Sequence, residues 1–250
     1  MSDCLVIIPT YNEKENIEKM IRKVMTLEEK EFNLLIIDDG SPDGTGAIVK
    51  SLMDEYKDRL FIVERKGKLG LGTAYIHGFK WALEHKYDYI FEMDADFSHN
   101  PLDLVRLYHA CSKDGAEVAI GSRYIHGVTV INWPIGRVLM SYYASAYVRF
   151  ITGMSIRDTT AGFVCFKRQV LETINFDKIK FMGYAFQIEM KFNAWKHGFI
   201  LKEIPIIFTD RTEGTSKMSG SIFKEAFFGV MQMRIKSMFR KFNKVSDTKK

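Results

Sequence analysis

The stretch YDYIFEMDADFSHNP (residues 87–101) carries the pattern that decides the fold. Its first half is rich in apolar and aromatic residues, which is typical of a β-strand, and its second half is a polar loop that ends at Pro101. Asp94 and Asp96 stand on either side of a small residue, directly after the apolar run. Two carboxylates that close repel each other unless a cation lies between them. The stretch therefore indicates a strand whose end could hold a metal ion.

Other segments repeat the arrangement of a short apolar run followed by polar residues. They are CLVIIPT (4–10), NLLIIDD (33–39), LFIVER (60–65) and AEVAIGS (116–122). Helical patterns lie between the runs, at about 13–27, 44–57, 72–86 and 101–114. Alternation of strands and helices predicts an α/β fold with a mainly parallel sheet flanked by helices. Continuous apolar runs such as LLII are typical of strands that are buried on both faces.

The polar residues of these segments gather where the strands end. The groups in question are 11–13, 38–41, 94–96 and 121–123. In an open α/β sheet, ligands bind in the crevice outside the carboxyl ends of the strands. The sequence therefore predicts one binding site, built from several loops, along that edge of the sheet.

The second half of the chain is less regular. An aromatic helix is expected at 134–152, strands at 163–166 and 204–209, and a helix at 219–242. We predict a catalytic domain over residues 1–218 and a basic, amphipathic C-terminal helix and tail over residues 219–250. Residues 217–250 contain nine Lys or Arg and two Asp or Glu, a net charge of +7, although the whole chain carries only +5. The positive charge is thus a property of the tail.

The expected helix at 219–242 has an apolar stripe at helical spacing and basic residues in its second half. Such a helix could lie in the interface of an anionic membrane leaflet. The alternative is that it packs on the core or on a partner subunit. Three widely spaced cysteines without a metal or disulfide spacing favour a reducing compartment, and the N-terminus has no signal-peptide pattern. We therefore expect a cytoplasmic protein that is peripheral on the cytoplasmic face of a membrane.

Alternatives remain for each polar motif when it is taken alone. Asp94 and Asp96 could form a solvated acidic loop, but the converging strand ends favour a metal–diphosphate site. The DDGSPDG stretch (38–44) reads first as a turn, in which Asp43 can cap the following helix. The glycine-rich KGKLGLGTAY (66–75) favours a loop near a nucleotide over a plain turn. A Rossmann enzyme is disfavoured because the first βα turn reads PTYNE and lacks glycine.

Taken together, the motifs resemble the polyprenol-phosphate (dolichol-phosphate) mannosyltransferases of inverting glycosyltransferase family 2. The matching stretches are PTYNE (9–13), DDGSPDGT (38–45), GLGTAY (70–75), DADFSHNP (94–101), GSRY (121–124), TAGF (160–163), FQIEM (186–190) and RTEGTSKM (211–218). The resemblance covers about residues 4–218. It implies a GT-A-type fold, GDP-mannose as donor, Mg²⁺ or Mn²⁺, and a polyprenyl phosphate lipid as acceptor.

The resemblance also implies roles for individual residues. The metal on the donor diphosphate would be held by Asp94 and Asp96, and Arg211 and Lys217 would steady the diphosphate or the sugar. The family often has Gln where this chain has Ser98. The nucleotide sugar would be bound by Pro9, Tyr11, Glu13, Ile37, Asp39, Asp94, Ala95 and Lys217. The acceptor phosphate would meet Arg123, Arg137 and Ser141, of which the last two lie four residues apart on an expected helix.

A phosphate acceptor needs no catalytic base, because it is already anionic near neutral pH. A related enzyme with UDP-glucose as donor or a hydroxyl as acceptor is the near alternative, and a hydroxyl would need a base such as Glu189 or Asp158. A metal-dependent nucleotidyltransferase and a non-catalytic nucleotide-sugar binder are alternatives of another class. We expect a membrane surface and no nucleic acid as partner. A membrane subunit or homo-oligomer is left open.

Overall fold

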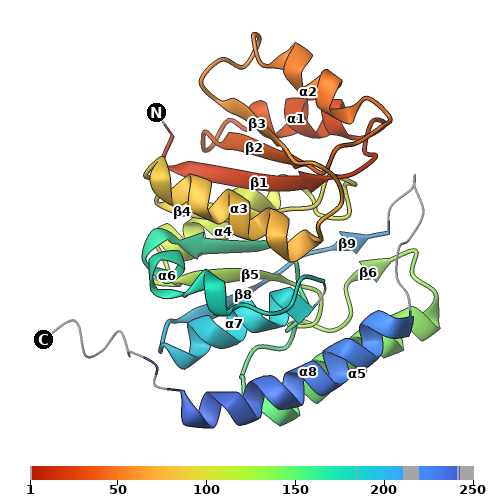
Figure 1. The fold of residues 1–250 in the computed structure, drawn as a ribbon, viewed down its shortest axis with the longest axis vertical. Coiled ribbons are helices and arrows are strands. Elements are labelled where there is room, and N and C mark those ends of the chain that lie inside the picture. The colour runs from red at the N-terminus through yellow and green to blue at the C-terminus, as the bar shows by residue number, and fades with distance from the viewer. Residues whose placement is uncertain (1, 184, 211–219, 241, 243–250) are drawn as a thin grey trace, which may run out of the picture.

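The computed structural model describes residues 2–183, 185–210, 220–240 and 242, with the backbone alone for 220–226. A seven-stranded sheet in the order β3-β2-β1-β4-β7-β5-β8 runs through the molecule (Figure 1). Its strands are β1 (Cys4–Thr10), β2 (Asn33–Asp38), β3 (Leu60–Glu64), β4 (Tyr89–Glu92), β5 (Val118–Ser122), β7 (Val164–Lys167) and β8 (Leu201–Pro205). All neighbours are parallel except β7, which is antiparallel to both β4 and β5. The predicted mainly parallel α/β sheet is confirmed.

The prediction of one strand over residues 204–209 is wrong, because this segment contributes to two strands. The chain leaves the large sheet after β8, and Phe208–Thr209 forms β9, which pairs with β6 (Val130–Ile131) in a separate two-stranded ribbon. Between the two strands, Ile206 turns into the core while Ile207 is exposed. A continuous apolar run therefore does not guarantee a continuous strand, because the two strands pair with different partners.

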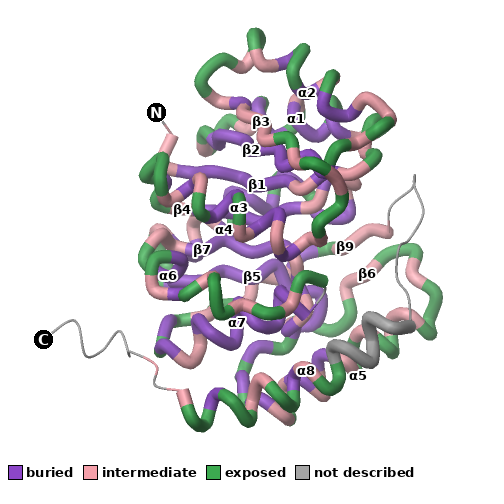
Figure 2. Tube along the Cα trace, in the orientation of Figure 1, coloured by how far each residue is buried: buried purple, intermediate pink, exposed green. Residues whose placement is uncertain are grey.

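Helices cover both faces of the sheet because the strand residues alternate between two cores. Val6 and Ile8 face α1 (Ile17–Met25), α2 (Thr45–Leu52) and α4 (Asp103–Ser112). Leu5 and Ile7 face α3 (Leu71–Glu84), α6 (Arg168–Thr173) and α7 (Ala185–Lys196). The inner strands of the sheet are buried along almost their whole length between these layers, whereas the edge strands β3 and β8 are only partly buried (Figure 2).

Two long helices form an outer layer beyond α7. They are α5 (Ile135–Thr152) and α8 (Gly220–Phe239), which contact each other and lie side by side at the bottom of Figure 1. Both were expected, within a few residues, from the sequence. Their large exposed apolar side chains include Ile135, Tyr143, Phe150, Phe228, Ile235, Met238 and Phe239. Within the described ranges, no helix combines the length and the apolar character needed to cross a membrane.

The carboxyl ends of β1, β2, β4 and β5 meet at one edge of the sheet, as predicted. Because β7 runs the other way, its amino end lies at this same edge, with Val164 opposite Glu92 and Ile120. The TAGF stretch (160–163) therefore joins the strand-end loops. This reversed strand was not foreseen from the sequence.

Candidate active site

The loop after β4 brings Asp94 and Asp96 to the wall of a cavity of about 460 Å³. Phe97 adopts a left-handed backbone conformation with φ of 59°, which turns the chain sharply. The backbone N–H of Ser98 donates to Oδ1 of Asp96 at 3.1 Å, and the N–H of Asp94 donates to Nδ1 of His99 at 3.3 Å. The turn thus points two carboxylates at one space, as the sequence predicted.

His99 holds this loop in place. Its ring stacks on Phe163 with centroids 4.9 Å apart, and the residue is buried. Burial lowers the pKa of His99 to about 4, so the neutral imidazole can accept the Asp94 N–H at physiological pH.

A metal at this loop would have two carboxylates from the protein. No cluster of three or more His, Cys, Asp or Glu side chains suited to a metal occurs among the described residues. The set nevertheless fits Mg²⁺ or Mn²⁺ bound with a nucleotide, because Mg²⁺ typically uses one or two carboxylates and completes its shell with phosphate oxygens and water. Beside them, the buried Ser98 hydroxyl lacks a hydrogen-bond partner within the described chain and could meet such a water.

The ends of β1 and β2 form a second polar group at the same edge. The Asp38 carboxylate accepts hydrogen bonds from the Thr10 hydroxyl at 2.9 Å and from the Ser41 hydroxyl at 2.6 Å, so it holds the two strand ends together. Asp39 instead pairs with Arg65, whose side chain is 7% exposed and whose Nε lies 2.6 Å from Asp39 Oδ1. The two adjacent aspartates thus differ in role, and Arg65 was missed by the sequence analysis.

Pro9, Tyr11, Glu13 and Ile37, which were also predicted for the nucleotide, lie at or just after the ends of β1 and β2. Pro9 is the strand neighbour of Ile37, and Lys68 reaches over the Tyr11 ring at 5.3 Å. The Glu13 backbone N–H donates to the Thr45 hydroxyl at 3.0 Å. The Ile37 and Ala95 side chains are buried in the cores. A ligand at this edge could therefore meet these two residues through the backbone only.

The glycines of the 66–75 loop are explained by packing. A Cβ on Gly72 would lie 2.8 Å from the Phe186 ring and 2.9 Å from the Phe181 carbonyl oxygen. Gly70 has a φ of 99°, and a Cβ added to it would lie 3.3 Å from the Cβ of Met182. These positions need glycine for close approach of α3 to the 181–186 segment, which accounts for them without a bound phosphate.

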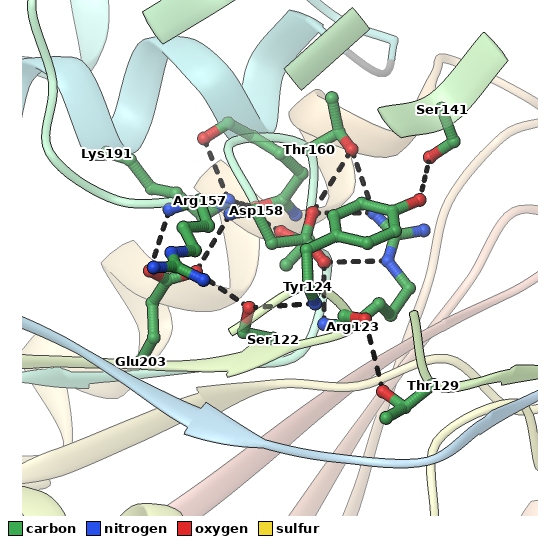
Figure 3. A network of polar contacts seen from close by, with 12 residues as sticks. Ser122, Arg123, Tyr124, Thr129, Ser141, Arg157, Asp158, Thr160, Lys191 and Glu203 are labelled. Carbon is green, nitrogen blue, oxygen red and sulfur yellow. Dashed lines mark hydrogen bonds and ion pairs between the residues drawn. The ribbon is translucent and has the colours of Figure 1, made fainter. Parts of the chain in front are cut away.

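Arg123, at the end of β5, is held by a buried ion pair. Its Nε and Nη2 donate to the two carboxylate oxygens of Asp158 at 2.7 Å each, and Nη2 also donates to the Thr160 hydroxyl at 2.8 Å (Figure 3). Burial would raise the pKa of Asp158, but the charge and hydrogen bonds of Arg123 outweigh it and hold that pKa below its usual value. Nη1 of Arg123 has no hydrogen-bond partner among the described residues, and the side chain lines the cavity.

A further residue behind this pair sets its position. Glu203 on β8 accepts from the Ser122 hydroxyl at 2.7 Å and from the backbone N–H groups of Arg157 and Asp158 at 2.7 and 2.8 Å. It therefore anchors the segment that carries Asp158 to the ends of β5 and β8, as Figure 3 shows. Nothing in the local sequence marks Glu203, because its partners lie about 45 and 80 residues away.

Arg137 and Ser141 lie on α5, where their spacing predicted that they share one face of a helix, and both line this cavity. Nη1 of Arg137 donates to both carboxylate oxygens of Asp210 at 2.9 and 3.0 Å, and its guanidinium lies 4.1 Å from the centroid of a Trp133 ring. The Tyr124 hydroxyl donates to the Ser141 hydroxyl at 2.7 Å. Two arginines and a hydroxyl pair thus line one wall of the cavity.

The other part of the cavity is apolar. It runs between α5, α7 and α8, where Tyr147 stacks on Phe227 with ring centroids 4.5 Å apart. Its apolar lining comprises Leu71, Met140, Tyr143, Ala144, Tyr147, Val148, Ile188, Phe227 and Val230. The cavity therefore has a charged end at the loops that follow the strands and an apolar end between the helices.

The two acids left open by the sequence have structural partners. Asp158 is the partner of Arg123, and Glu189 accepts from the backbone N–H groups of Lys180 and Phe181 at 2.8 and 3.1 Å. Glu189 does not line the cavity that holds Asp94 and Asp96. Arg211 and Lys217, which the resemblance implies at the donor diphosphate, lie outside the described residues.

Beneath the cavity lies a buried charged group that the sequence did not reveal. The Lys191 ammonium donates to the Ala161 carbonyl at 2.6 Å and the Gln187 carbonyl at 3.1 Å, which ties α7 to the loop before β7. Burial raises the pKa of Glu92 to about 8 and lowers that of Lys191 to about 8, and each charge opposes the shift of the other. A period-2 strand pattern offers no signal for a fully buried Glu92.

Comparison with known proteins gives the family. The profile of the family described as Glycosyl transferase family 2 matches residues 5–174, which is more than half of the chain. The chain belongs to glycosyl transferase family 2. The matched region of this glycosyltransferase contains β1 to β7 and so includes Asp94, Asp96, Arg123 and Arg137.

Two curated relatives are similar over nearly the whole glycosyltransferase. A polyprenol monophosphomannose synthase of Mycolicibacterium smegmatis is 46% identical over 93% of this chain and 87% of the relative. An undecaprenyl-phosphate mannosyltransferase of Micrococcus luteus is 41% identical over 90% of this chain and 91% of the relative. The resemblance drawn from the motifs is thereby confirmed.

Solved structures support the GT-A-type fold of this glycosyltransferase. Glucosyl-3-phosphoglycerate synthase of Mycobacterium tuberculosis matches with a TM-score of 0.68 at 16% identity, over 94% of this chain and 80% of that one. A mannosyltransferase of Pyrobaculum calidifontis, solved with GDP-Man and Mn²⁺, matches with a TM-score of 0.60 at 17% identity, over 96% and 65%. At these identities the likeness concerns the fold alone.

Proposed function

We propose that this chain transfers mannose from GDP-mannose to a polyprenyl phosphate with inversion, giving polyprenyl-phosphate β-mannose. The observation that carries the proposal is the two-ended cavity, in which carboxylates and arginines stand at one end and an apolar channel lies at the other. A polyprenyl phosphate has the same division, with a charged head on an oily chain. The names of the two curated relatives agree with such an acceptor.

The donor would lie across the ends of β1, β2 and β4. The guanosine would meet Tyr11, Glu13 and the Asp39–Arg65 pair, and the diphosphate would approach Asp94 and Asp96, where Mg²⁺ or Mn²⁺ fits. When bound, that ion would neutralise the negative charge that develops on the departing GDP. By resemblance to the family, Arg211 and Lys217 would steady the diphosphate or the sugar.

The acceptor phosphate would lie against Arg123 and Arg137. Asp158 and Asp210 fix the two guanidinium planes, which leaves Nη1 of Arg123 and the remaining N–H groups of Arg137 to meet phosphate oxygens. Arg123 offers one nitrogen to the phosphate, whereas the planar guanidinium of Arg137 keeps Nε and Nη2 and can bind two phosphate oxygens, which also orients the attacking oxygen. The first isoprenoid units would then occupy the apolar part of the cavity between α5, α7 and α8.

The reaction needs no proton transfer. A phosphate oxygen of the acceptor forms a bond to the anomeric carbon, while the bond from that carbon to the GDP oxygen breaks and its electron pair leaves with GDP. Attack from the face opposite GDP inverts the α-linked donor to a β product. The protein contributes positioning and positive charge.

The placement of the acids disfavours a hydroxyl acceptor. Such an acceptor would need a carboxylate base, but Asp158 is held in its ionised form by a bidentate arginine, which makes it a poor base. Glu189 lies away from the cavity and is bound to backbone N–H groups. An anionic acceptor avoids this need, which is why we favour the phosphate.

A lipid acceptor brings the enzyme to a membrane surface. The exposed aromatic and aliphatic side chains of α5 and α8 flank the apolar end of the cavity, and helices of this kind can lie in the headgroup region of a bilayer. We infer peripheral attachment to the cytoplasmic face, with the open end of the channel toward the lipid. A lipid substrate could then enter the cavity without crossing water.

The test offers radiolabelled GDP-mannose and UDP-glucose separately, each with a polyprenyl phosphate and with or without EDTA. We expect lipid-extractable label from GDP-mannose alone and its loss on chelation. Label from UDP-glucose alone would remove the donor assignment, and release of pyrophosphate from free NTP would indicate a nucleotidyltransferase. Binding of GDP without any turnover would leave a nucleotide-sugar binder.

A further inference from the structure

A second cavity of about 310 Å³ lies away from the strand-end loops. It is bounded by the 177–181 segment, by α7 and by the C-terminal half of α8. Its apolar walls are Phe181, Phe192, Met233 and Phe242. It shares no lining residue with the cavity that holds Asp94 and Asp96. It is therefore a separate feature of the molecule, which the proposed transfer reaction leaves without a role.

The charged side chains around this second cavity are mostly basic. They are Lys178, Lys180, Lys236 and Arg240, against Asp177 and Glu189. Both acids are engaged, because Glu189 accepts two backbone N–H groups and Asp177 lies 3.6 Å from Lys80. Neither Lys180 nor Lys236 forms an ion pair with a carboxylate of the described residues. The cavity thus carries uncompensated positive charge.

Lys180 and Lys236 line the same cavity, and their charges influence each other. The pKa of Lys236 is lowered, chiefly by its close approach to Lys180, and Glu189 opposes the shift. Two ammonium groups repel each other, and an anion placed between them removes that cost. Nearby, Arg240 is fixed by a hydrogen bond from its Nη1 to Asn193 Oδ1 at 3.2 Å and by the Phe242 ring, whose centroid lies 5.0 Å from the guanidinium carbon.

We propose that this second cavity is a phosphate-binding site, in which Lys180, Lys236 and Arg240 hold a phosphate group. Three cations, which come from the loop before α7, from α8 and from the residue after α8, line one open cavity and match a compact anion with several oxygens. The aromatic walls favour a phosphate attached to an organic group. The site is independent of the proposed transfer reaction, so either assignment can fail without the other.

Two sources can supply this phosphate. One is the headgroup of an anionic phospholipid, because Ile235, Met238 and Phe239 are exposed on the end of α8 that also carries Lys236 and leads into Arg240. A lipid there would hold the C-terminal half of α8 on the membrane. The other source is a free phosphate compound from solution. Both present the same oxygens to the same cations.

The first measurement titrates inorganic phosphate into the full chain and follows the amide NMR signals of Lys180 and Phe181. We expect saturable shifts that K236Q and K180Q each weaken about fivefold, roughly the effect of one lysine at an anionic surface. The matched control is R234Q, which removes one charge from α8 two residues away, does not line the cavity and should leave the titration unchanged. If both lysines bind the same phosphate, the effects of K180Q and K236Q on the phosphate-binding free energy should not add up in the double variant.

The second measurement compares binding of the same variants to phosphatidylcholine vesicles with and without phosphatidylglycerol. If a lipid headgroup is the source, K236Q and K180Q lose more binding to the anionic vesicles than R234Q does. If K236Q and R234Q are equal on vesicles while free phosphate still saturates the site, the source is a soluble phosphate. If K180Q, K236Q and R234Q lose the same amount of phosphate binding and of vesicle binding, the proposed phosphate site is wrong. Binding would then depend only on diffuse surface charge.

Discussion

At the scale of single residues, the candidate site depends on ion pairs that are buried at the wall of the cavity. Arg123 and Asp158 lie almost wholly out of water, and such burial costs several kcal/mol per ion unless the geometry and the extra hydrogen bonds repay it. Here the pair is bidentate, and Thr160 and the Arg123 backbone N–H add two further bonds. The pair therefore places a guanidinium at the cavity wall in one orientation.

We expect Asp158→Asn to destabilise the fold, because it leaves the Arg123 charge buried without a counter-charge. A loss of about 3–5 kcal/mol in the free energy of unfolding is typical for such a change. Urea denaturation measures it, and Thr160→Val should cost less because the ion pair remains. Equal stability of Asp158→Asn and the parent chain would contradict the assignment.

The same carboxylate predicts a pH dependence. Its folded pKa lies below the unfolded value of 3.8, so its contribution is fully present above that value and is lost as the pH falls through the folded pKa. Below about pH 3.8, the stability of the parent chain should therefore fall more steeply than that of Asp158→Asn. Denaturation midpoints measured from neutral to acidic pH give this comparison, and parallel curves would argue against it.

Arg137 offers the sharpest test of the acceptor phosphate. We expect Arg137→Ala to lower kcat/KM for the polyprenyl phosphate about 10²-fold or more, the usual effect of removing one donor that meets charge in the transition state. Arg137→Lys should restore only part of it, because an ammonium lacks the paired geometry of the guanidinium. Steady-state transfer rates measure both. An unchanged rate with Arg137→Ala, or a larger loss with Glu189→Gln, would favour a hydroxyl acceptor.

At the scale of elements, glycines decide how closely the helices approach. Gly78 lets α3 lie against Ile7 of β1, where a Cβ would meet its side chain at 2.7 Å. Gly229 does the same for α8, because an added Cβ there would overlap the Phe181 ring. The apolar channel and the second cavity both border α8, so their shapes depend on this contact.

Gly72→Ala should separate α3 from α7. The added methyl group would overlap Phe186 and the backbone of Phe181, and overpacking of this kind costs about 1–3 kcal/mol. Gly136→Ala in α5 is the control, because a Cβ there meets nothing within 4 Å and should be neutral or stabilising by up to about 1 kcal/mol. Thermal denaturation compares the two, and equal effects would show that the close approach is unimportant.

The outer face of α8 predicts membrane attachment. Met238 and Phe239 are 62% and 86% exposed, and burial of each in a bilayer interface would contribute on the order of 1.5–3 kcal/mol. M238S/F239S should therefore bind vesicles at least about tenfold more weakly in flotation, without loss of stability. Ile200→Ser is the control, because it removes a half-exposed apolar side chain that precedes β8 and belongs to neither α5 nor α8. Equal flotation of all three proteins would count against a membrane face.

At the scale of the whole molecule, the sheet joins two parts. β1 to β4 form a parallel unit that carries the predicted donor residues, and β7, β5 and β8 carry Arg123 and its supporting acids. The cavity lies where the two parts meet, next to the reversed strand β7. Donor and acceptor would therefore come together only in the complete sheet. Where the catalytic domain ends along the chain, at residue 218, stays a prediction.

A ligand that bridges strand-end loops should stabilise the whole fold. GDP with Mn²⁺ at about 100 times its Kd should raise the free energy of unfolding by about 2.7 kcal/mol, because it binds the folded chain alone. The shift should vanish with EDTA and in D94N/D96N, and scanning calorimetry measures it. A shift of the same size in D94N/D96N would place the metal elsewhere.

Much of the architecture could be predicted because it is periodic. The positions of β1, β2, β5 and the longer helices follow from short apolar runs and helical spacing, and the gathering of polar residues follows from parallel strands. The strand β7 was predicted, but its antiparallel direction was not, because no local sequence signal marks the direction of a strand. The division of 204–209 into β8 and β9 was missed for the same reason, since strand pairing is decided by distant partners.

The sequence by itself determined the sheet, its polar edge and the identity of the residues at that edge, because these depend on periodicity and on side-chain chemistry along the chain. Only the tertiary structure decided what each acid does. Asp39 forms an ion pair with Arg65, and Asp158 forms one with Arg123. Glu203 on β8 binds Ser122 at the end of β5. In each case the partners are 26 or more residues apart in the sequence. The two cavities likewise exist only after α7 and α8 have packed, because their walls come from segments that are far apart in sequence.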